Sequence, residues 1–131
     1  MQLQGKKVVF LGDSITEGAG ASSPETCFVS VFGANEGAVA RNFGIGATRI
    51  APQRKRVGEN DHHDFLSRVD TLDKDADIVV VFGGTNDYGH GDAPFGRRED
   101  ETEETFCRAC NVLFRRLNER FRSAVKVALT P

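Results

Sequence analysis

Apolar residues occur along the chain in two patterns, as unbroken runs and as stripes at helical spacing. The unbroken runs within Lys6–Gly12 and Ile78–Phe82 are typical of strands buried on both faces of a parallel sheet. Shorter apolar segments over Ala38–Ile45 and over residues 124–131 predict two more strands. Strands buried on both faces need helices on either side, so the pattern predicts an α/β fold with a central parallel sheet.

Three segments between these strands place apolar side chains on one helical face. They predict helices over Pro24–Gly37, Asp61–Leu72 and Glu101–Arg122. The apolar stripe of the last and longest helix consists of Phe106, Cys110, Leu113, Leu117 and Phe121. Acidic residues near the start of this helix and arginines near its end match the sign of the helix dipole.

Two polar segments, residues 44–60 and 85–100, carry the glycines, prolines and charges of surface loops. Three turns rich in glycine or polar residues follow the first three predicted strands, at Gly12–Ser14, Gly44–Thr48 and Gly83–Asp87. In parallel sheets, ligands bind beyond the carboxyl ends of the strands. We therefore expect these three turns to line one cleft.

Length and composition narrow the class of protein. A chain of 131 residues is long enough for one domain with a hydrophobic core and too short for two. A net charge of -2 gives no signature of nucleic-acid binding, and no run approaches the roughly 18 apolar residues that cross a bilayer. The first residues lack the apolar stretch of a signal peptide, and the three cysteines form no disulfide framework. We expect a cytoplasmic protein without a nucleic-acid or membrane partner.

Ser14 is the first candidate for catalysis, because α/β enzymes often place a nucleophile directly after a buried strand. Acyl transfer also needs hydrogen-bond donors for the developing oxyanion. Candidates are the backbone N–H of Ser14, the side-chain amide of Asn86 and a backbone N–H of the second turn. A simpler interpretation is a helix-entry turn in which Asp13 or Ser14 caps backbone amides.

Taken in order, the segments GDSIT, NFGIGATRI and GGTND resemble the conserved blocks of the GDSL or SGNH hydrolase superfamily of esterases and lipases. The resemblance spans the chain and implies a flavodoxin-like α/β/α sandwich. It also implies that Ser14 is the nucleophile, that Asn86 is an oxyanion donor and that Asp13 braces the serine turn. It requires no cofactor and no metal.

The second block departs from the family at one position. The family places an oxyanion glycine five residues after the asparagine of this block, which is Asn42 here, and the matching residue is Ala47. An alanine N–H still donates, although a positive φ there would cost roughly 1 kcal/mol. Gly44 or Gly46 takes the role if the loop is shifted.

Residues around the expected cleft are candidates for substrate binding. They are Gly46, Thr48, Arg49 and His90. We expect Thr48 and Arg49 to face the cleft, where Arg49 would suit an acidic or hydroxylated substrate. A solvated loop arginine is the simpler interpretation of Arg49.

The general base is the largest departure from the family. The family places an Asp-x-x-His block after a further strand, and no residue of this chain matches it in order. Asp87–His90 has the spacing but overlaps the asparagine block, so we interpret the spacing as coincidental and keep His90 as a candidate base near the cleft. We expect residues 1–131 to be a C-terminally incomplete domain with about four strands and a fifth missing. An exposed edge strand would then offer a surface for homodimerisation.

Two further clusters have simple interpretations. Residues 61–64, Asp-His-His-Asp, would point about 100° apart on a helix, which favours a solvated helix start over a metal site. Cys107 and Cys110 lie on one helical face, where packing against the core is favoured over redox or metal chemistry.

The leading hypothesis is a serine ester hydrolase that cleaves a small acyl or acetyl ester through an acyl-serine intermediate. The alternative is an inactive or truncated module that binds an acyl or carbohydrate ligand in the same cleft. A phosphate or nucleotide binder is the least favoured hypothesis, because the chain lacks Gly-x-Gly-x-x-Gly and Walker patterns.

Overall fold

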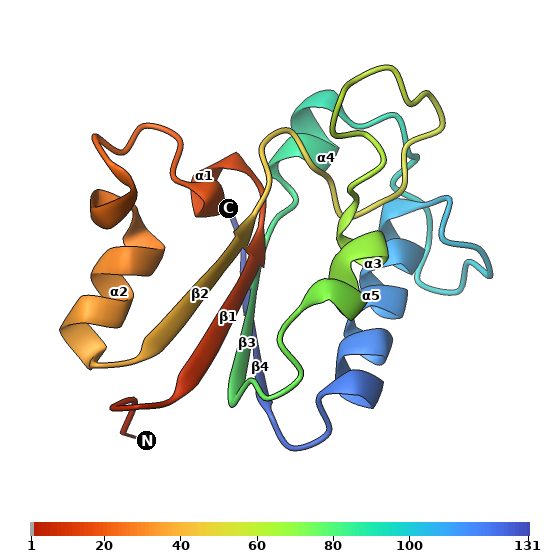
Figure 1. Cartoon of the computed structure of the whole chain (residues 1–131). Coiled ribbons are helices and arrows are strands. Elements are labelled where there is room, and N and C mark those ends of the chain that lie inside the picture. Colours follow the sequence, from red (N-terminus) through yellow and green to blue (C-terminus); the bar gives the residue numbers. More distant parts are fainter. Residues whose placement is uncertain (1) are drawn as a thin grey trace.

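Four parallel strands form the centre of the molecule. They are β1 (Lys7–Gly12), β2 (Val39–Gly44), β3 (Ile78–Phe82) and β4 (Val125–Leu129), in the order β2-β1-β3-β4. The computed structural model describes residues 2–131, and Figure 1 shows helices on both faces of the sheet. The predicted fold is confirmed, since this is the strand order of a flavodoxin-like α/β/α sandwich.

The two central strands divide their side chains between two hydrophobic cores. Alternate residues of a strand point to opposite faces, so each of these strands contributes to both cores. Those in the larger core are Val9, Leu11, Val79 and Val81. Those in the smaller core are Val8, Phe10, Ile78 and Val80. This arrangement explains why the sequence of both strands is an unbroken apolar run.

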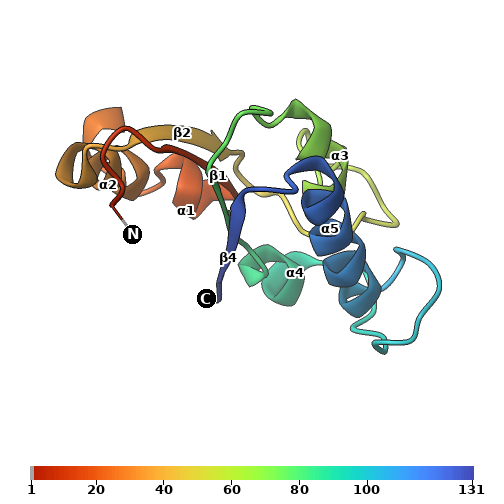
Figure 2. The same ribbon diagram turned by 90° about the horizontal axis from the view of Figure 1, so that it is seen from below.

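The helices cover the sheet unequally. Helices α1 (Ser14–Glu17) and α2 (Phe28–Glu36) lie on one side, and α3 (Phe65–Arg68) and α5 (Phe106–Arg120) lie on the other, as Figures 1 and 2 show. Helix α4 (Thr85–His90) lies beyond the carboxyl ends of the strands. Over residues 2–131, no helix combines the length and the apolar composition needed to cross a membrane.

The long amphipathic helix is present, but it begins later than predicted. It starts at Phe106, because the hydroxyl oxygen of Thr105 caps it by accepting a hydrogen bond from Arg108 N at 3.4 Å. The acidic residues from Glu101 onward therefore precede the helix, and the prediction that they lie in its first turn is wrong. Asp100 holds the preceding turn in place by accepting a hydrogen bond from the Thr105 hydroxyl at 2.8 Å.

Two other predicted helices are shorter than expected. Residues 24–37 form a 3-10 turn at Pro24–Thr26 followed by α2, because Cys27 between them has an extended backbone with φ -67° and ψ 150°. Residues 61–72 form only α3 and a 3-10 turn at Val69–Thr71. Asp64 caps α3 by accepting a hydrogen bond from the backbone of Ser67 at 3.0 Å, so the residues before it are a turn.

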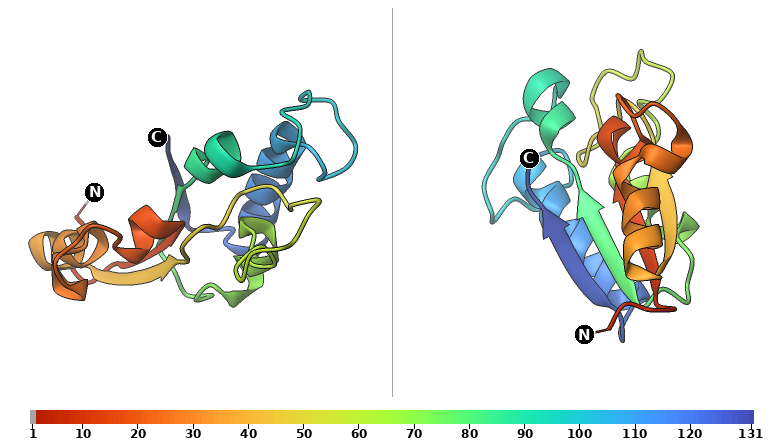
Figure 3. Two further views of the ribbon diagram at one scale, coloured as in Figure 1. Left: turned by 90° about the horizontal axis from the view of Figure 1, so that it is seen from above. Right: turned by 90° about the vertical axis from the view of Figure 1, so that its left-hand side faces the viewer.

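The segment 85–100 was predicted to be a loop, and its first part is helix α4 instead. Gly84 starts this helix with φ 111°, a conformation that favours glycine, and its carbonyl accepts a hydrogen bond from Tyr88 N at 3.0 Å. Strand β4 lies at the edge of the sheet opposite β2, as Figure 3 shows. Its residues Val125 and Leu129 are exposed. Pairing of two copies along this edge stays a prediction.

Candidate active site

The candidate site lies where the order of the strands reverses. The chain passes from β1 to β2 on one side and returns to β3 on the other, so the turns after β1 and β3 flank a switch point. In open parallel sheets this is where ligands bind. Ser14 follows β1 and Asn86 lies in α4 after β3, so both candidate residues stand at this point.

Ser14 is the first residue of α1, and Asp13 fixes the turn that presents it. Asp13 is 2% exposed, and its carboxylate accepts a hydrogen bond from Ile15 N at 2.9 Å. Its backbone carbonyl accepts another from Glu17 N at 2.9 Å. Asp13 is thus the helix cap that the simpler interpretation predicted, and the same bonds hold the half-buried Ser14 at the end of β1.

The turn after β2 contacts the serine turn directly. Ile45 N donates to the carbonyl of Gly12 at 3.1 Å. A Cβ placed on Gly46 would lie 3.8 Å from the Cβ of Ser14 and 2.8 Å from a carboxylate oxygen of Glu17. The loop therefore lies beside α1, and a side chain at position 46 would require the Glu17 carboxylate to move.

Ala47, the residue that stands where the family has glycine, has a left-handed backbone conformation. Its φ is 62°, and it is the one non-glycine residue with a positive φ among residues 2–131. An L-residue in this conformation stores on the order of 1 kcal/mol or more of strain, which persists only where the surroundings impose it. The strain lies in the loop that the resemblance identifies with the oxyanion hole.

Ala47→Gly is expected to stabilise the fold by about 0.5 kcal/mol. Glycine relieves strain of roughly 1–2 kcal/mol at a positive φ, and its greater freedom in the unfolded chain cancels about 0.4–1 kcal/mol of this. Urea unfolding at equilibrium measures the difference. Ala51→Gly is a matched control at a buried position without positive φ, where we expect destabilisation. An Ala47→Gly variant that is clearly less stable than the wild type would contradict the strain.

Asn86 is held against the same loop. Its side-chain Nδ2 donates to the backbone carbonyl of Thr48 at 3.0 Å. An amide nitrogen carries two hydrogens, so one remains for another acceptor. The neighbouring Asp87 accepts hydrogen bonds from the backbone N–H groups of Ile50 and Ala51, both at 2.9 Å. Burial raises the pKa of Asp87 in spite of these two bonds.

The three turns that the sequence singled out therefore meet. The loop 45–48 contacts the serine turn at one end and Asn86 at the other. Its own position is supported from the far side by Asn60, whose Nδ2 donates to the carbonyl of Gly46 at 2.9 Å. This arrangement places the serine turn, the loop 45–48 and Asn86 next to one another in this order of contact.

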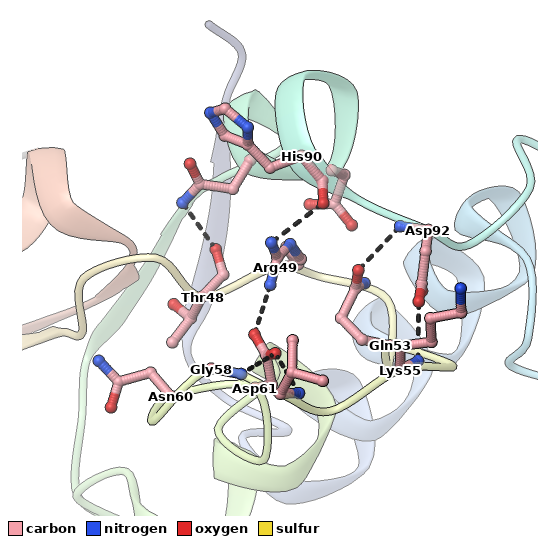
Figure 4. A network of polar contacts seen from close by, with 12 residues as sticks. Thr48, Arg49, Gln53, Lys55, Gly58, Asn60, Asp61, His90 and Asp92 are labelled. Atoms are coloured by element: carbon pink, nitrogen blue, oxygen red, sulfur yellow. Dashed lines mark hydrogen bonds and ion pairs between the residues drawn. The ribbon is translucent and has the colours of Figure 1, made fainter.

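The side chains of Thr48 and Arg49 lie in other surroundings than the sequence predicts. Thr48 is 2% exposed, and its hydroxyl donates to the carbonyl of Ile45 at 2.7 Å, so the expectation that its side chain faces the cleft is wrong. Arg49 is not a solvated arginine, because its guanidinium binds the Asp61 carboxylate at 2.6 Å and the backbone carbonyl of His90 at 3.0 Å (Figure 4). Amide donation from Gly58 and the pairing with Arg49 lower the pKa of Asp61.

His90 lies at the end of α4 with its side chain exposed. Figure 4 shows its ring directed away from Arg49, which binds only the backbone carbonyl of His90. Among residues 2–131, no hydrogen bond joins the Ser14 hydroxyl to an imidazole. Asp87 and His90 do not form a hydrogen-bonded pair in this structure, because the Asp87 carboxylate accepts its hydrogen bonds from the backbone of Ile50 and Ala51.

The remaining clusters carry no metal site in the described part of the chain. Within residues 2–131, no group of three or more His, Cys, Asp or Glu residues is arranged to hold a metal ion. Cys107 and Cys110 are free and half-buried, and burial raises the pKa of the Cys110 thiol to about 11. Cys27 is free and buried.

Sequence reasoning missed Arg68. This side chain is 5% exposed and lies beneath the candidate site, where it binds the carbonyls at the ends of β1 and β2. A signal was present, because Arg68 interrupts the apolar segment Phe65 to Val69. Nothing in that segment indicates its partners, which lie elsewhere in the sequence.

The strand order β2-β1-β3-β4, with GDSIT after β1 and GGTND after β3, is typical of the GDSL-like, or SGNH, class of hydrolases. Residues 10–130 match the GDSL-like Lipase/Acylhydrolase family, and the chain belongs to this family. No curated protein matches the chain.

Solved structures show the same fold over nearly the whole chain. One is 33% identical, with a TM-score of 0.86, and the match covers 100% of this chain and 59% of the other. A protein from Lactobacillus plantarum is 28% identical with a TM-score of 0.78, covering 98% of this chain and 57% of its own. A protein from Bacteroides uniformis described as a GDSL-like lipase is 24% identical with a TM-score of 0.76, covering 97% and 71%. The chain thus spans less than two thirds of the length of the 33% identical protein and of the Lactobacillus plantarum protein.

Proposed function

We propose that this chain carries the nucleophile and the oxyanion donors of a serine ester hydrolase for small acyl or acetyl esters. The observation that carries the proposal is that one loop, residues 45–48, bonds to both flanking turns: Ile45 N donates to the carbonyl of Gly12 in the serine turn, and the carbonyl of Thr48 accepts from Asn86. A nucleophile and a set of donors on three separate turns then share one position where a carbonyl carbon can lie.

The reaction in this proposal has two steps. The hydroxyl oxygen of Ser14 attacks the ester carbonyl, its proton passes to an imidazole, and the carbonyl oxygen becomes an oxyanion. The N–H groups of Ser14 and Ala47 and the free hydrogen of Asn86 Nδ2 bind this oxyanion. The C–O bond then breaks, and the alcohol leaves with the proton from the imidazole. Water attacks the acyl-serine in the same way and releases the carboxylic acid.

The imidazole in this scheme belongs to the Asp-x-x-His block of the family, which has no match within residues 2–131. His90 is the candidate within the chain, and its exposed ring would have to turn toward Ser14. An activated serine loses orders of magnitude in rate without a base, but the oxyanion donors and substrate binding retain part of the catalysis.

The substrate class is proposed from one relative. A structure from Sinorhizobium meliloti, described as a carbohydrate acetylesterase family member, shares the fold at 21% identity and a TM-score of 0.65, covering 96% of this chain and 62% of its own. This supports an acetyl ester as the first substrate to test.

The test is hydrolysis of p-nitrophenyl acetate by the 131-residue chain in imidazole buffer. Free imidazole accepts the proton of Ser14, so we expect release of nitrophenolate above that of buffer with the same imidazole, and an excess that rises with imidazole concentration. A rate no higher than that of buffer at every imidazole concentration would contradict the proposed hydrolase activity. Binding of acetylated sugars by the same sample, followed by NMR, would then favour the ligand-binding alternative.

A further inference from the structure

Arg68 is the most deeply buried cation near the candidate site, and its guanidinium is almost fully occupied. Nε donates to the carbonyl of His63 at 2.9 Å, and Nη1 donates to the carbonyl of Phe43 at 2.6 Å. Nη2 donates to the carbonyl of Gly12 at 3.1 Å and to the hydroxyl of Thr48 at 3.0 Å. One side chain therefore joins four segments of the chain.

Two of these four partners, Gly12 and Thr48, belong to the turns of the candidate site, and a third lies next to one of them. Gly12 ends β1 two residues before Ser14, and Phe43 is the second-last residue of β2, just before the loop 45–48. The backbone carbonyl of Thr48 holds Asn86. The bonds of Arg68 thus reach the nucleophile through Gly12 and the asparagine donor through Thr48.

The surroundings keep Arg68 charged and fixed. Its guanidinium lies over the ring of Phe65, 5.0 Å from the ring centroid. Burial lowers the pKa of Arg68 to about 10, while the nearby carboxylates of Asp64 and Asp13 act in the opposite direction, so the group carries its charge at neutral pH. A planar guanidinium with five N–H donors can serve carbonyls that lie in different directions, which an ammonium cannot do.

We propose that Arg68 is a positioning residue that fixes Ser14, the loop 45–48 and Asn86 relative to one another. The proposal rests on the function proposed above, and it adds a residue that touches neither the ester nor Ser14. Without Arg68, the buried carbonyls of Gly12 and Phe43 lose a donor, and the serine turn and the loop are free to move apart.

The experiment compares Arg68→Lys and Arg68→Met with the wild type by two measurements at a temperature where all are folded. The first is the rate at which a fluorophosphonate labels Ser14 in imidazole buffer. We expect the labelling rate of both variants to fall about 100-fold, because a displacement of reacting groups on the order of 1 Å has an effect of this size. The second is amide hydrogen exchange, which we expect to become faster at Ile45 and Thr48, whose N–H groups bond within these turns.

Arg120→Met is the matched control. Arg120 also donates to two backbone carbonyls, those of Asp70 and Leu72, and lies over a ring, that of Phe121, but at the opposite end of the sheet. We expect this variant to melt at a lower temperature and to label at the rate of the wild type. Thr48→Val removes one bond of Arg68 together with the bond of the same hydroxyl to the carbonyl of Ile45. It serves where the Arg68 variants do not fold, and we expect a smaller loss of the same kind.

The outcomes separate this proposal from the proposed function. Slower labelling with faster exchange in the loop 45–48, absent in Arg120→Met, supports Arg68 as a positioning residue. Labelling and exchange in the loop that match the wild type would overturn it and leave Arg68 a stabilising residue only. If the wild type is not labelled at all, the proposed function fails, and the exchange measurement alone decides the role of Arg68.

Discussion

Ser14→Ala is expected to abolish covalent labelling of the chain by a fluorophosphonate. These reagents phosphonylate a serine whose hydroxyl is deprotonated in the transition state and whose developing phosphonyl oxyanion is bound by donors. In the proposed function Ser14 is this serine, and the loop 45–48 beside its turn supplies one of the donors. Intact mass spectrometry after incubation in imidazole buffer measures the label, and peptide mapping places it.

Ser123→Ala provides the matched control for this variant. Ser123 is exposed between α5 and β4, at the end of the sheet remote from Ser14. We expect this variant to be labelled like the wild type. Labelling that persists in Ser14→Ala at the wild-type rate would mean that another residue reacts, and it would end the proposed function.

Asn86→Asp is expected to lower the labelling rate about 100-fold to 1,000-fold, the effect of losing one oxyanion donor, which corresponds to about 3–4 kcal/mol. Aspartate has the shape of asparagine but carries no donor when it is ionised. It would also face the carbonyl of Thr48 without a hydrogen to share. The negative charge opposes the charge that forms in the transition state. Labelling rates of purified protein, measured as initial rates, test this expectation.

Asn118→Asp controls for the added charge, because Asn118 is exposed on α5 away from the site. We expect its labelling rate to equal that of the wild type. An Asn86→Asp variant that reacts as fast as Asn118→Asp would show that Asn86 stabilises the fold through Thr48 and contributes nothing to the oxyanion.

The sheet could be predicted from the sequence because burial on both faces leaves an unmistakable pattern. The runs around Val9 and Val79 contain no polar residue, and no helix of ordinary amphipathic character has this pattern. The meeting of the three turns followed from the parallel order of the strands, since all carboxyl ends then lie at one edge. The residues that carry the resemblance to the family lie on these turns.

The helix starts could not be predicted, because they depend on side-chain bonds that the apolar period does not reveal. Thr105 is the cap of α5 because Asp100 binds its hydroxyl, and Asp64 is the cap of α3. The sequence favours a loop at helix α4 because the helix contains Gly89 and is flanked by Gly84 and Gly91. The carboxylate of Asp87 in this helix binds the backbone N–H groups of Ile50 and Ala51, which the sequence does not indicate. Each of these partners is set by the tertiary fold.

The charged residues near the site were the hardest to interpret from sequence. Arg49 resembles any loop arginine until Asp61 is seen to lie 2.6 Å away. Arg68 resembles the polar edge of an amphipathic helix until the carbonyls of Gly12 and Phe43 appear around it. Burial of a cation depends on acceptors from distant segments, and hydrophobic patterning carries no information about them.

The central claim is that Ser14, the loop 45–48 and Asn86 act on one oxyanion. A crystal structure of the chain phosphonylated at Ser14 tests it most directly. We expect the phosphonyl oxygen within hydrogen-bond distance of Asn86 Nδ2 and of the backbone N–H groups of Ser14 and Ala47. A phosphonyl group that points into solvent, with Asn86 and Ala47 out of reach of its oxygen, would contradict the claim.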